Sequence, residues 1–450
     1  MGRRSRIPDF VSRTLIEQGV IGGGPALPTG QAYGFLYLDT GYDTPDTETN
    51  DYPIYVDEET TTLAQSSDSI SSPVSGRLRY DGAAPTVFLV HQVTTLRCRT
   101  SDSSNYSEYG IAVGQQGKPG PKSINAGDSG RLATHAMLIS TMKPNEVIDG
   151  FAYFYYSAVQ NVSFHSLIAK ELLGAYGLIK HTVDGASTSA GWQLIPCTTG
   201  LHIGNEFSMP SNMRLRYDGA VTKKFRVDLT YTHDESSSDY ADQHGIYENG
   251  VLVAESVVAR RGNNNGRASH VHTHCFVELA QNDYVEGYIN RGGASSTTVR
   301  AATLGVAELG AAYGLLYLTA TGTYADNATW TKAPGTTSIG ATVADFSQEA
   351  NNRLRYDGAV TKKFVVSADV SLSFTGATSS INQVCIYKNG TIVPGTTQLS
   401  FKYGADKPIT LTTQAIIELA EDDYVEVWLQ KADSLTTTVH NIILSAAEFA

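Results

Sequence analysis

The sequence predicts an all-β protein made of three tandem antiparallel jelly-roll sandwiches, preceded by a short N-terminal arm. Three observations predict this class. The phrase R-L-R-Y-D-G occurs three times, with its tyrosine at Tyr80, Tyr217 and Tyr356, which are 137 and 139 residues apart. Each copy alternates apolar and charged residues with the period of a strand. Short strand-like runs separated by Gly, Asn, Asp and Ser fill the chain, with little helical periodicity.

Length and repeat spacing set the domain boundaries. A chain of 450 residues is long enough for about three domains of roughly 100 to 150 residues each. Related opening and closing phrases then divide it into an arm at residues 1–31, a divergent first unit at 32–174, a second unit at 175–310 and a third unit at 311–450.

Composition excludes several classes of partner. The net charge is -12, and binding to a phosphate backbone requires clustered cations, so nucleic acid is not an expected partner. No apolar run reaches the length of a membrane span, and the N-terminus lacks the apolar core of a signal peptide. Four widely spaced cysteines form no C-x-x-C pair and are typical of buried free thiols. We therefore expect synthesis in a cytoplasm and no membrane association.

The N-terminal arm is basic and can form a short helix after Pro8 that ends at the glycines from Gly22. A helix this short needs a partner surface to be stable in water. The arm is therefore either an anchor that docks on another protein or a disordered terminus. The candidate anchor residues are Arg3, Arg4, Arg6, Phe10, Val11 and Leu15.

The repeated phrase predicts a hairpin. Leu354 and Tyr356 fall on one face of a strand and the two arginines on the other. The Asp-Gly pair that follows is typical of a two-residue turn with positive φ. Asn249-Gly250 and Asn389-Gly390 predict further turns of this kind. The predicted hairpin residues are Tyr80, Asp81, Gly82, Tyr217, Asp218, Gly219, Tyr356, Asp357 and Gly358.

Two strand-like runs carry candidate functional residues. His270, His272 and His274 alternate along one strand face, where three imidazoles are able to bind zinc, nickel or copper. Their counterparts in the third unit are polar, so we favour a solvent-facing strand without a metal and predict no cofactor. A second run places aromatic residues on both strand faces, which predicts either a contact between units or between subunits, or burial within one sandwich. The candidate interface residues are Phe151, Tyr153 and Tyr155.

The segment from Leu419 to Val427 resembles the L-x-x-G-D-x-V-x-V turn of complement-type globular heads, whose jelly roll is shared with tumour necrosis factor. With the R-L-x-Y-x-G strand, the I-Y-K-N-G turn and an early tryptophan, the pattern is similar to jelly-roll modules of phage structural proteins. Glu421 and Asp422 depart from the usual glycine, and the first unit departs further. The resemblance covers nearly all of the second and third units.

The resemblance implies a structural virion protein of a tailed bacteriophage, located in the virion as a capsid decoration, spike or fibre module. It also implies that the jelly rolls associate in threes and that the partners are other virion proteins. Either three chains form a homotrimer, or the three units of one chain pack as an intramolecular pseudo-trimer, which the tight joints at Gly174 and Gly310 favour. The alternative function is a receptor-binding adhesin that recognises host-surface carbohydrate. The chain has none of the common catalytic motifs, so we expect no enzyme and no catalytic residues.

Overall fold

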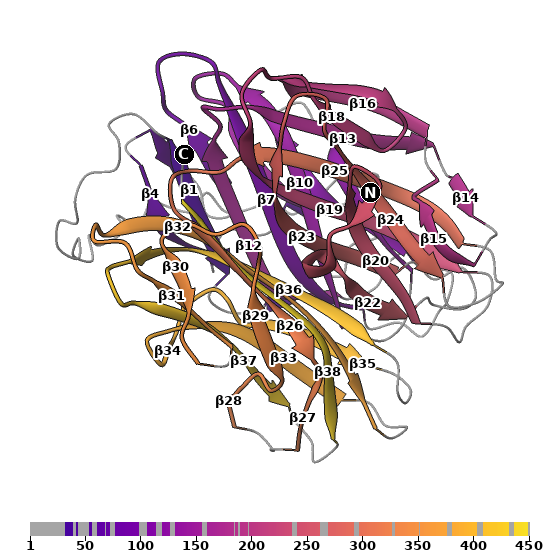
Figure 1. Ribbon diagram of the computed structural model, residues 1–450, viewed down its shortest axis with the longest axis vertical. Helices are drawn as coiled ribbons and strands as arrows, with labels where there is room; N and C mark the ends of the chain where they lie inside the picture. The colour runs from indigo at the N-terminus through magenta and orange to yellow at the C-terminus, as the bar shows by residue number, and fades with distance from the viewer. Residues whose placement is uncertain are drawn as a thin grey trace, which may run out of the picture.

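Strands dominate the computed structural model of the chain (Figure 1). Its described part contains no α-helix and one short 3-10 turn, η1 (Ala254–Ser256), which confirms the all-β prediction. No helix in that part is long and apolar enough to cross a membrane. The structure describes residues 32–38, 42–43, 54–55, 61–67, 69–72, 77–98, 106–113, 119–126, 131–154, 160–183, 185–187, 190–196, 198–235, 241–261, 269–291, 297–325, 329–350, 352–375, 380–402, 408–431 and 436–448.

The strands fall into three groups along the chain, each of two antiparallel sheets, here called the first, second and third sheet pairs. In the first pair the inner sheet has the order β10-β7-β12-β1-β4 with β2 beside β12, and the outer sheet has the order β5-β6-β11-β8-β9 with β3 beside β11. The strands are β1 (Tyr33–Leu38), β2 (Tyr42–Asp43), β3 (Ile54–Tyr55), β4 (Thr61–Ser66), β5 (Ile70–Ser71), β6 (Arg77–Tyr80), β7 (Thr86–Cys98), β8 (Tyr106–Val113), β9 (Pro119–Ala126), β10 (Arg131–Met142), β11 (Val147–Phe154) and β12 (Gln160–Glu171).

The second pair repeats this order. Its inner sheet runs β23-β19-β25-β13-β16 with β14 beside β25, and its outer sheet runs β17-β18-β24-β20-β21 with β15 beside β24 and β22 beside β20. The strands are β13 (Tyr176–Val183), β14 (Gly185–Ser187), β15 (Gly191–Leu194), β16 (Thr198–Asn205), β17 (Phe207–Ser211), β18 (Arg214–Tyr217), β19 (Lys223–Glu235), β20 (Ala241–Glu248), β21 (Val251–Leu252), β22 (Val258–Arg261), β23 (Ser269–Leu279), β24 (Tyr284–Arg291) and β25 (Thr297–Glu308).

The third sheet pair has the same strand order as the second. Its inner sheet runs β36-β32-β38-β26-β29 with β27 beside β38, and its outer sheet runs β30-β31-β37-β33-β34 with β28 beside β37 and β35 beside β33. The strands are β26 (Tyr313–Ala320), β27 (Gly322–Tyr324), β28 (Thr331–Lys332), β29 (Thr336–Ile339), β30 (Phe346–Gln348), β31 (Arg353–Tyr356), β32 (Lys362–Phe374), β33 (Ser380–Lys388), β34 (Thr391–Ile392), β35 (Gln398–Lys402), β36 (Ile409–Leu419), β37 (Tyr424–Lys431) and β38 (Thr437–Glu448).

Contacts between the sheet pairs close a ring. Leu178 of the second pair joins a hydrophobic cluster with the first pair, Leu315 of the third joins the core of the second, and Phe35 of the first joins the core of the third. Lys363 Nζ donates a hydrogen bond of 2.7 Å to Tyr33 Oη, which also links the third pair to the first. Figure 1 shows the three colour ranges side by side around a common centre.

The edge strands of the outer sheets follow the same cyclic order. Strand β9 of the first pair contacts β23 and β25 of the second, and β22 of the second contacts β32 and β36 of the third. Strand β35 of the third pair contacts β7 and β10 of the first. Each pair thus reaches over the inner sheet of the next pair, so one chain contributes all three members of the ring.

The repeated phrase forms a strand as predicted, but the predicted hairpin is wrong. Buried and half-buried residues alternate in β6, β18 and β31, which confirms the period of two. The strands that flank the Asp-Gly pair do not pair with each other, because β18 lies in the outer sheet and β19 in the inner sheet. Gly82, Gly219 and Gly358 are absent from the described residues with positive φ.

The glycine of the phrase is required by the tyrosine two residues before it. A Cβ on Gly219 would lie 2.2 Å from Tyr217 Oη, and the other two copies have the same close approach. Tyr217 is fully buried and its hydroxyl donates to the Val221 carbonyl at 2.7 Å. The equivalent bonds run from Tyr80 to Ala84 at 2.8 Å and from Tyr356 to Val360 at 2.7 Å. The connection between the two sheets is therefore fixed by a tyrosine ring that lies over a glycine.

Each charged residue of the phrase also has a partner. The first arginine binds an acid on the neighbouring outer strand, and the second binds the aspartate two residues later. The first set is Arg77 with Asp149 at 2.8 Å, Arg214 with Glu286 at 2.8 Å and Arg353 with Glu426 at 2.9 Å. The second set is Arg79 with Asp81 at 2.5 Å, Arg216 with Asp218 at 2.8 Å and Arg355 with Asp357 at 2.7 Å.

The Asn-Gly turns are confirmed. Asn249 and Gly250 have φ of 50° and 80°, and they join β20 to β21, which pair as neighbours. Asn389 and Gly390 have φ of 50° and 76° between β33 and β34. Positive φ at both central positions is the conformation that Asn-Gly tolerates best, so these turns follow directly from local sequence.

Candidate functional site

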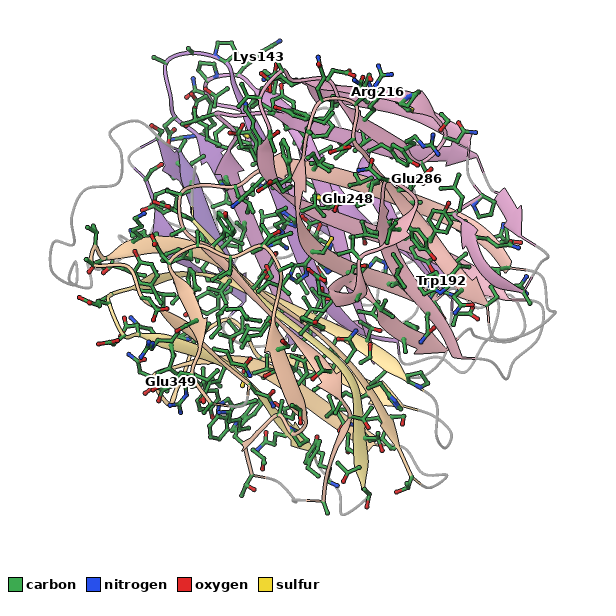
Figure 2. The ribbon with its side chains drawn as sticks, in the orientation of Figure 1. Lys143, Trp192, Arg216, Glu248, Glu286 and Glu349 are labelled. Atoms are coloured by element: carbon green, nitrogen blue, oxygen red, sulfur yellow. The ribbon has the colours of Figure 1, made fainter. Side chains whose placement is uncertain are left out.

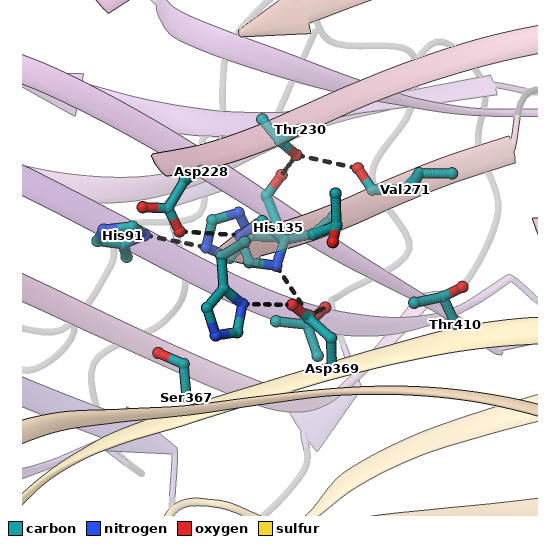
Figure 3. A network of polar contacts seen from close by, with 12 residues as sticks. His91, His135, Asp228, Thr230, Val271, Ser367, Asp369 and Thr410 are labelled. Atoms are coloured by element: carbon teal, nitrogen blue, oxygen red, sulfur yellow. Dashed lines mark hydrogen bonds and ion pairs between the residues drawn. The ribbon is translucent and has the colours of Figure 1, made fainter. Parts of the chain in front are cut away.

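The inner sheets meet at a buried cluster of ionisable residues, here called the polar junction. Strands from all three sheet pairs contribute to it, and Figure 3 shows these strands converging on the side chains. All of its members are at most 5% exposed. The polar junction consists of His91 and His135 of the first pair, Arg226, Asp228, His270, His272 and His274 of the second, and Asp369 of the third.

Strand periodicity explains which side chains point into the polar junction. His272 and His274 lie on one face of β23, and on the adjacent strand β19 their cross-strand partners are Thr230 and Asp228. Asp369 occupies the equivalent position to Thr230 on β32, since its cross-strand partner Thr412 corresponds to His272. The faces that carry these residues are the inner faces of the ring.

His272 lies between two carboxylates from different sheet pairs. Its Nδ1 is 2.8 Å from Asp369 Oδ1, and its Nε2 is 3.2 Å from Asp228 Oδ1. Arg226 also binds Asp228, through Nε and Nη2 at 2.7 to 3.0 Å. Arg226 Nη1 donates to Ser367 Oγ at 3.1 Å, a second link to the third sheet pair.

His274 makes a parallel set of contacts. Its Nδ1 is 2.6 Å from Asp369 Oδ2, and its Nε2 is 2.7 Å from Ser445 Oγ on β38. Thr412 Oγ1 donates to Asp369 Oδ1 at 2.6 Å. Both oxygens of Asp369 are therefore occupied by partners, two of them histidines of the neighbouring sheet pair.

The first sheet pair joins the cluster through backbone and ring contacts. The His135 amide donates to His270 Nε2 at 2.8 Å, and its carbonyl accepts from Thr230 at 3.1 Å. The His135 ring lies 3.8 Å from that of His272, measured between centroids. His91 Nδ1 is 3.1 Å from His135 Nε2.

Most histidines of the polar junction are neutral. Burial lowers the pKa of His91 to about 3. Burial also lowers the pKa of His135 and that of His270 well below the usual value, with His272 adding to the effect in both cases. The pKa of His274 falls because of burial and the nearby Arg226.

His272 is the exception, and its charge balances the site. Burial alone would lower its pKa, but the carboxylates of Asp369 and Asp228 raise the pKa to about 9. Burial would raise the pKa of both carboxyl groups, yet Arg226 and His272 hold the pKa of Asp228 well below its usual value, and His272 does the same for Asp369. At neutral pH two cations therefore face two carboxylates in a dry interior, where an unpaired charge would be costly.

The polar junction is not threefold symmetric. One position of the equivalent strands β7, β19 and β32 carries His91, Asp228 and Ser367. Two residues further along each strand, on the same face, the chain has Val93, Thr230 and Asp369. Three copies of the third sheet pair would bring three Asp369 carboxylates together without the histidines, because Thr412 and Gln414 stand at the positions of His272 and His274. The observed ring instead places Asp369 against two histidines of a different pair. The polar contacts at the centre therefore join residues of different sheet pairs.

The expectation that His270, His272 and His274 lie on a solvent-facing strand is wrong. The three side chains are 4%, 1% and 0% exposed, because another sheet pair covers the face that carries them. They also do not share one set of partners, since His270 contacts the first pair while His272 and His274 contact the third. Sequence reasoning missed Asp228 and Asp369, whose signal was an acid near the middle of a long strand.

Stacked aromatic residues lie on the outer sheets, and the sequence analysis did not identify them as a set. Tyr247 stacks on Tyr288 at 3.9 Å, with Trp192 5.7 Å from Tyr247. These side chains are half-buried and lie on the face of the sheet that points away from the core. Figure 2 shows Trp192 toward the periphery of the second sheet pair. The third pair repeats the arrangement with Tyr387 stacked on Trp428 at 4.3 Å and Trp330 6.3 Å from Tyr387. We call these two sets the outer aromatic strips.

Other predicted residues are placed only in part. The candidate anchor residues Arg3, Arg4, Arg6, Phe10, Val11 and Leu15 lie outside the described residues, as does Tyr155. Phe151 and Tyr153 lie on β11, a central strand that pairs with β3, β6 and β8 of its own sheet. Two of the four cysteines, Cys275 and Cys385, are buried free thiols as predicted.

No protein-family model and no curated protein matches the chain. Among solved structures it is similar to a chain described as the triple jelly-roll fold and turret assembly of an archaeal virus, with 8% identity over 96% of this chain and 99% of that one and a TM-score of 0.19. It is also similar to a chain of Sulfolobus turreted icosahedral virus, with 9% identity over 92% and 91% and a TM-score of 0.19. A third similar structure is dimeric latent PorU from Porphyromonas gingivalis, with 9% identity over 78% of this chain and 33% of that one and a TM-score of 0.22.

Proposed function

We propose that the chain is a structural protein of a virus particle, built as an intramolecular pseudo-trimer of three jelly-roll units. The observation that supports this most is the closed ring of sheet pairs, in which Phe35, Leu178 and Leu315 play equivalent roles at the three contacts. Jelly-roll modules of the resembled family associate in threes. Here one chain supplies all three members, with an asymmetric polar junction that matches each to its neighbours.

A protein of this kind works through its surfaces. Its buried faces hold the ring together, and the outer sheets and loops remain available for contacts with other virion proteins. We propose a role as a capsid decoration, spike or fibre module of a tailed bacteriophage, attached through residues 1–31. The proposed role is non-enzymatic and is located in the virion.

Particle composition tests the proposal. Mass spectrometry of purified virus particles should find the chain as a stoichiometric component, and an antibody against the third sheet pair should label intact particles in electron microscopy. A variant without residues 2–30 should keep its circular dichroism spectrum and disappear from the particles. Recovery of the chain only in the soluble fraction of the lysate would refute a structural role, and retention of the shortened chain would refute the anchor.

The outer aromatic strips favour one alternative, a receptor-binding adhesin that recognises host-surface carbohydrate. Half-exposed Trp and Tyr side chains concentrate binding energy at interfaces, and the strips recur at equivalent places in two sheet pairs. A glycan array should then give hits that a Trp192→Ala and Trp330→Ala double variant loses. An array without hits would remove this alternative and leave the structural role intact.

A further inference from the structure

We propose that His272, His274 and Asp369 bind a divalent transition metal ion, with zinc preferred, between the second and third sheet pairs. The three side chains offer two imidazole nitrogens and a carboxylate oxygen that lie within 4.8 Å of one another. All three are at most 1% exposed. Two imidazole nitrogens with one carboxylate, once His272 has released the proton that its carboxylate partners favour, form a set that suits zinc and its neighbours and is unlike the all-oxygen sites of calcium or magnesium.

The candidate ligand atoms are close enough to share one ion. Ligand atoms about 2.1 Å from a zinc ion lie roughly 3.4 Å apart at tetrahedral angles. The Nδ1 atoms of His272 and His274 are 2.8 Å and 2.6 Å from the two oxygens of Asp369. Small side-chain rotations would therefore open room for an ion between groups that already converge. The Nδ1 proton of His272 would be released as the ion takes its place, because Nε2 keeps its own proton toward Asp228, whereas the Nδ1 proton of the neutral His274 would move to Nε2, which faces Ser445 Oγ.

The surroundings are those of metal-ligating histidines. Such histidines commonly donate the second ring N–H to a carboxylate or another acceptor, which fixes the ring. His272 Nε2 faces Asp228, and Arg226 in turn holds that carboxylate. His274 Nε2 faces the hydroxyl of Ser445 at 2.7 Å. The candidate ligands therefore come with the outer contacts that orient a ligand set, and these contacts also span two sheet pairs.

The structure selects a different set from the one that spacing suggests. His270 lies on the same strand face as His272 and His274, but its Nε2 accepts from the His135 amide and its Nδ1 is 3.3 Å from Thr232 Oγ1. Asp369 takes the third place from across the ring. An ion held by β23 and β32 would cross-link the second and third sheet pairs from inside.

Metal content of the intact protein tests the proposal. The full chain, made without a histidine tag in zinc-supplemented medium, is dialysed against metal-free buffer and measured by plasma mass spectrometry. We expect one zinc per chain in the wild type and less than a fifth of that in His274→Gln and Asp369→Asn. His274→Gln introduces the residue that the third pair carries at the equivalent position, Gln414, so it suits the fold. The matched control His270→Gln should retain the full zinc content.

A second measurement does not depend on variants. Wild-type chain made in cobalt-supplemented minimal medium should show the visible absorption of tetrahedral cobalt with nitrogen and oxygen ligands. A folded wild type that carries neither stoichiometric zinc nor this cobalt spectrum would overturn the proposal. Loss of zinc from His270→Gln equal to that from His274→Gln would overturn the assignment of the ligands.

Discussion

The contact between tyrosine and glycine in the repeated phrase gives the sharpest mutational prediction. Any side chain at Gly219 must meet the buried ring of Tyr217, because a Cβ would lie 2.2 Å from Oη and 2.3 Å from Cζ. Overpacking of this kind costs about 1 to 3 kcal/mol, and loss of the bond from Tyr217 to the Val221 carbonyl adds about 1 kcal/mol. We expect Gly219→Ala and Gly219→Asn each to lower the free energy of unfolding by about 2 to 4 kcal/mol.

Comparison with Gly250 separates this cause from turn conformation. Gly250 has φ of 80°, and the one atom near its would-be Cβ is Tyr284 Oη at 3.5 Å. There Gly250→Ala should cost about 1 kcal/mol, and Gly250→Asn less, because Asn tolerates left-handed backbone. Urea unfolding followed by circular dichroism and tryptophan fluorescence measures all four variants. If Gly219→Asn stays within about 0.5 kcal/mol of wild type while Gly219→Ala does not, the requirement is conformational and our explanation fails.

Three further predictions concern a buried neutral histidine, a buried ion pair and a hydrogen bond from a backbone amide to a carboxylate. His244 is fully buried, and burial lowers its pKa to about 3, so below about pH 6.5 the unfolded state binds a proton that the folded state does not. The free energy of unfolding should therefore fall by about 2 kcal/mol between pH 8 and pH 5 because of this residue. His244→Phe should reduce the measured pH dependence by that amount. Arg226→Leu and Asp228→Ser should each cost about 3 to 5 kcal/mol in urea unfolding because each strands a buried charge, whereas the double variant should cost less than their sum, and additivity would contradict the pairing. The Ala175 amide at the start of the second sheet pair donates to Glu308 Oε2 at its end, at 2.8 Å. Glu308→Gln weakens this hydrogen bond and should cost about 1 kcal/mol, detectable as a lower urea midpoint. An unchanged midpoint would argue against a stabilising role for the bond.

Local sequence predicted the features that depend on local geometry. The alternation in R-L-R-Y-D-G and the Asn-Gly turns followed from strand pleat and from the backbone that Asn and Gly tolerate. The role of Gly219 did not follow, because a turn with positive φ and a covering ring both require glycine. Only the placement of β18 and β19 in different sheets distinguishes the two causes.

The polar junction shows a second limit. Polar residues at period two look the same whether water or another protein surface covers them, so His270, His272 and His274 were assigned to solvent. The distinguishing signal lay elsewhere in the chain. Asp228 and Asp369 lie near the middle of the 13-residue strands β19 and β32, where a buried carboxylate requires partners.

The mass of the full chain in solution tests the central claim, that one chain supplies all three members of the ring. Sedimentation equilibrium over a range of concentrations should give a single species near the chain mass of 48.3 kDa. The contact between Lys363 and Tyr33, with the cores that surround it, closes the ring within that species. A stable species of about 145 kDa, three times the chain mass, would show that separate chains complete the threefold contacts and would contradict the account.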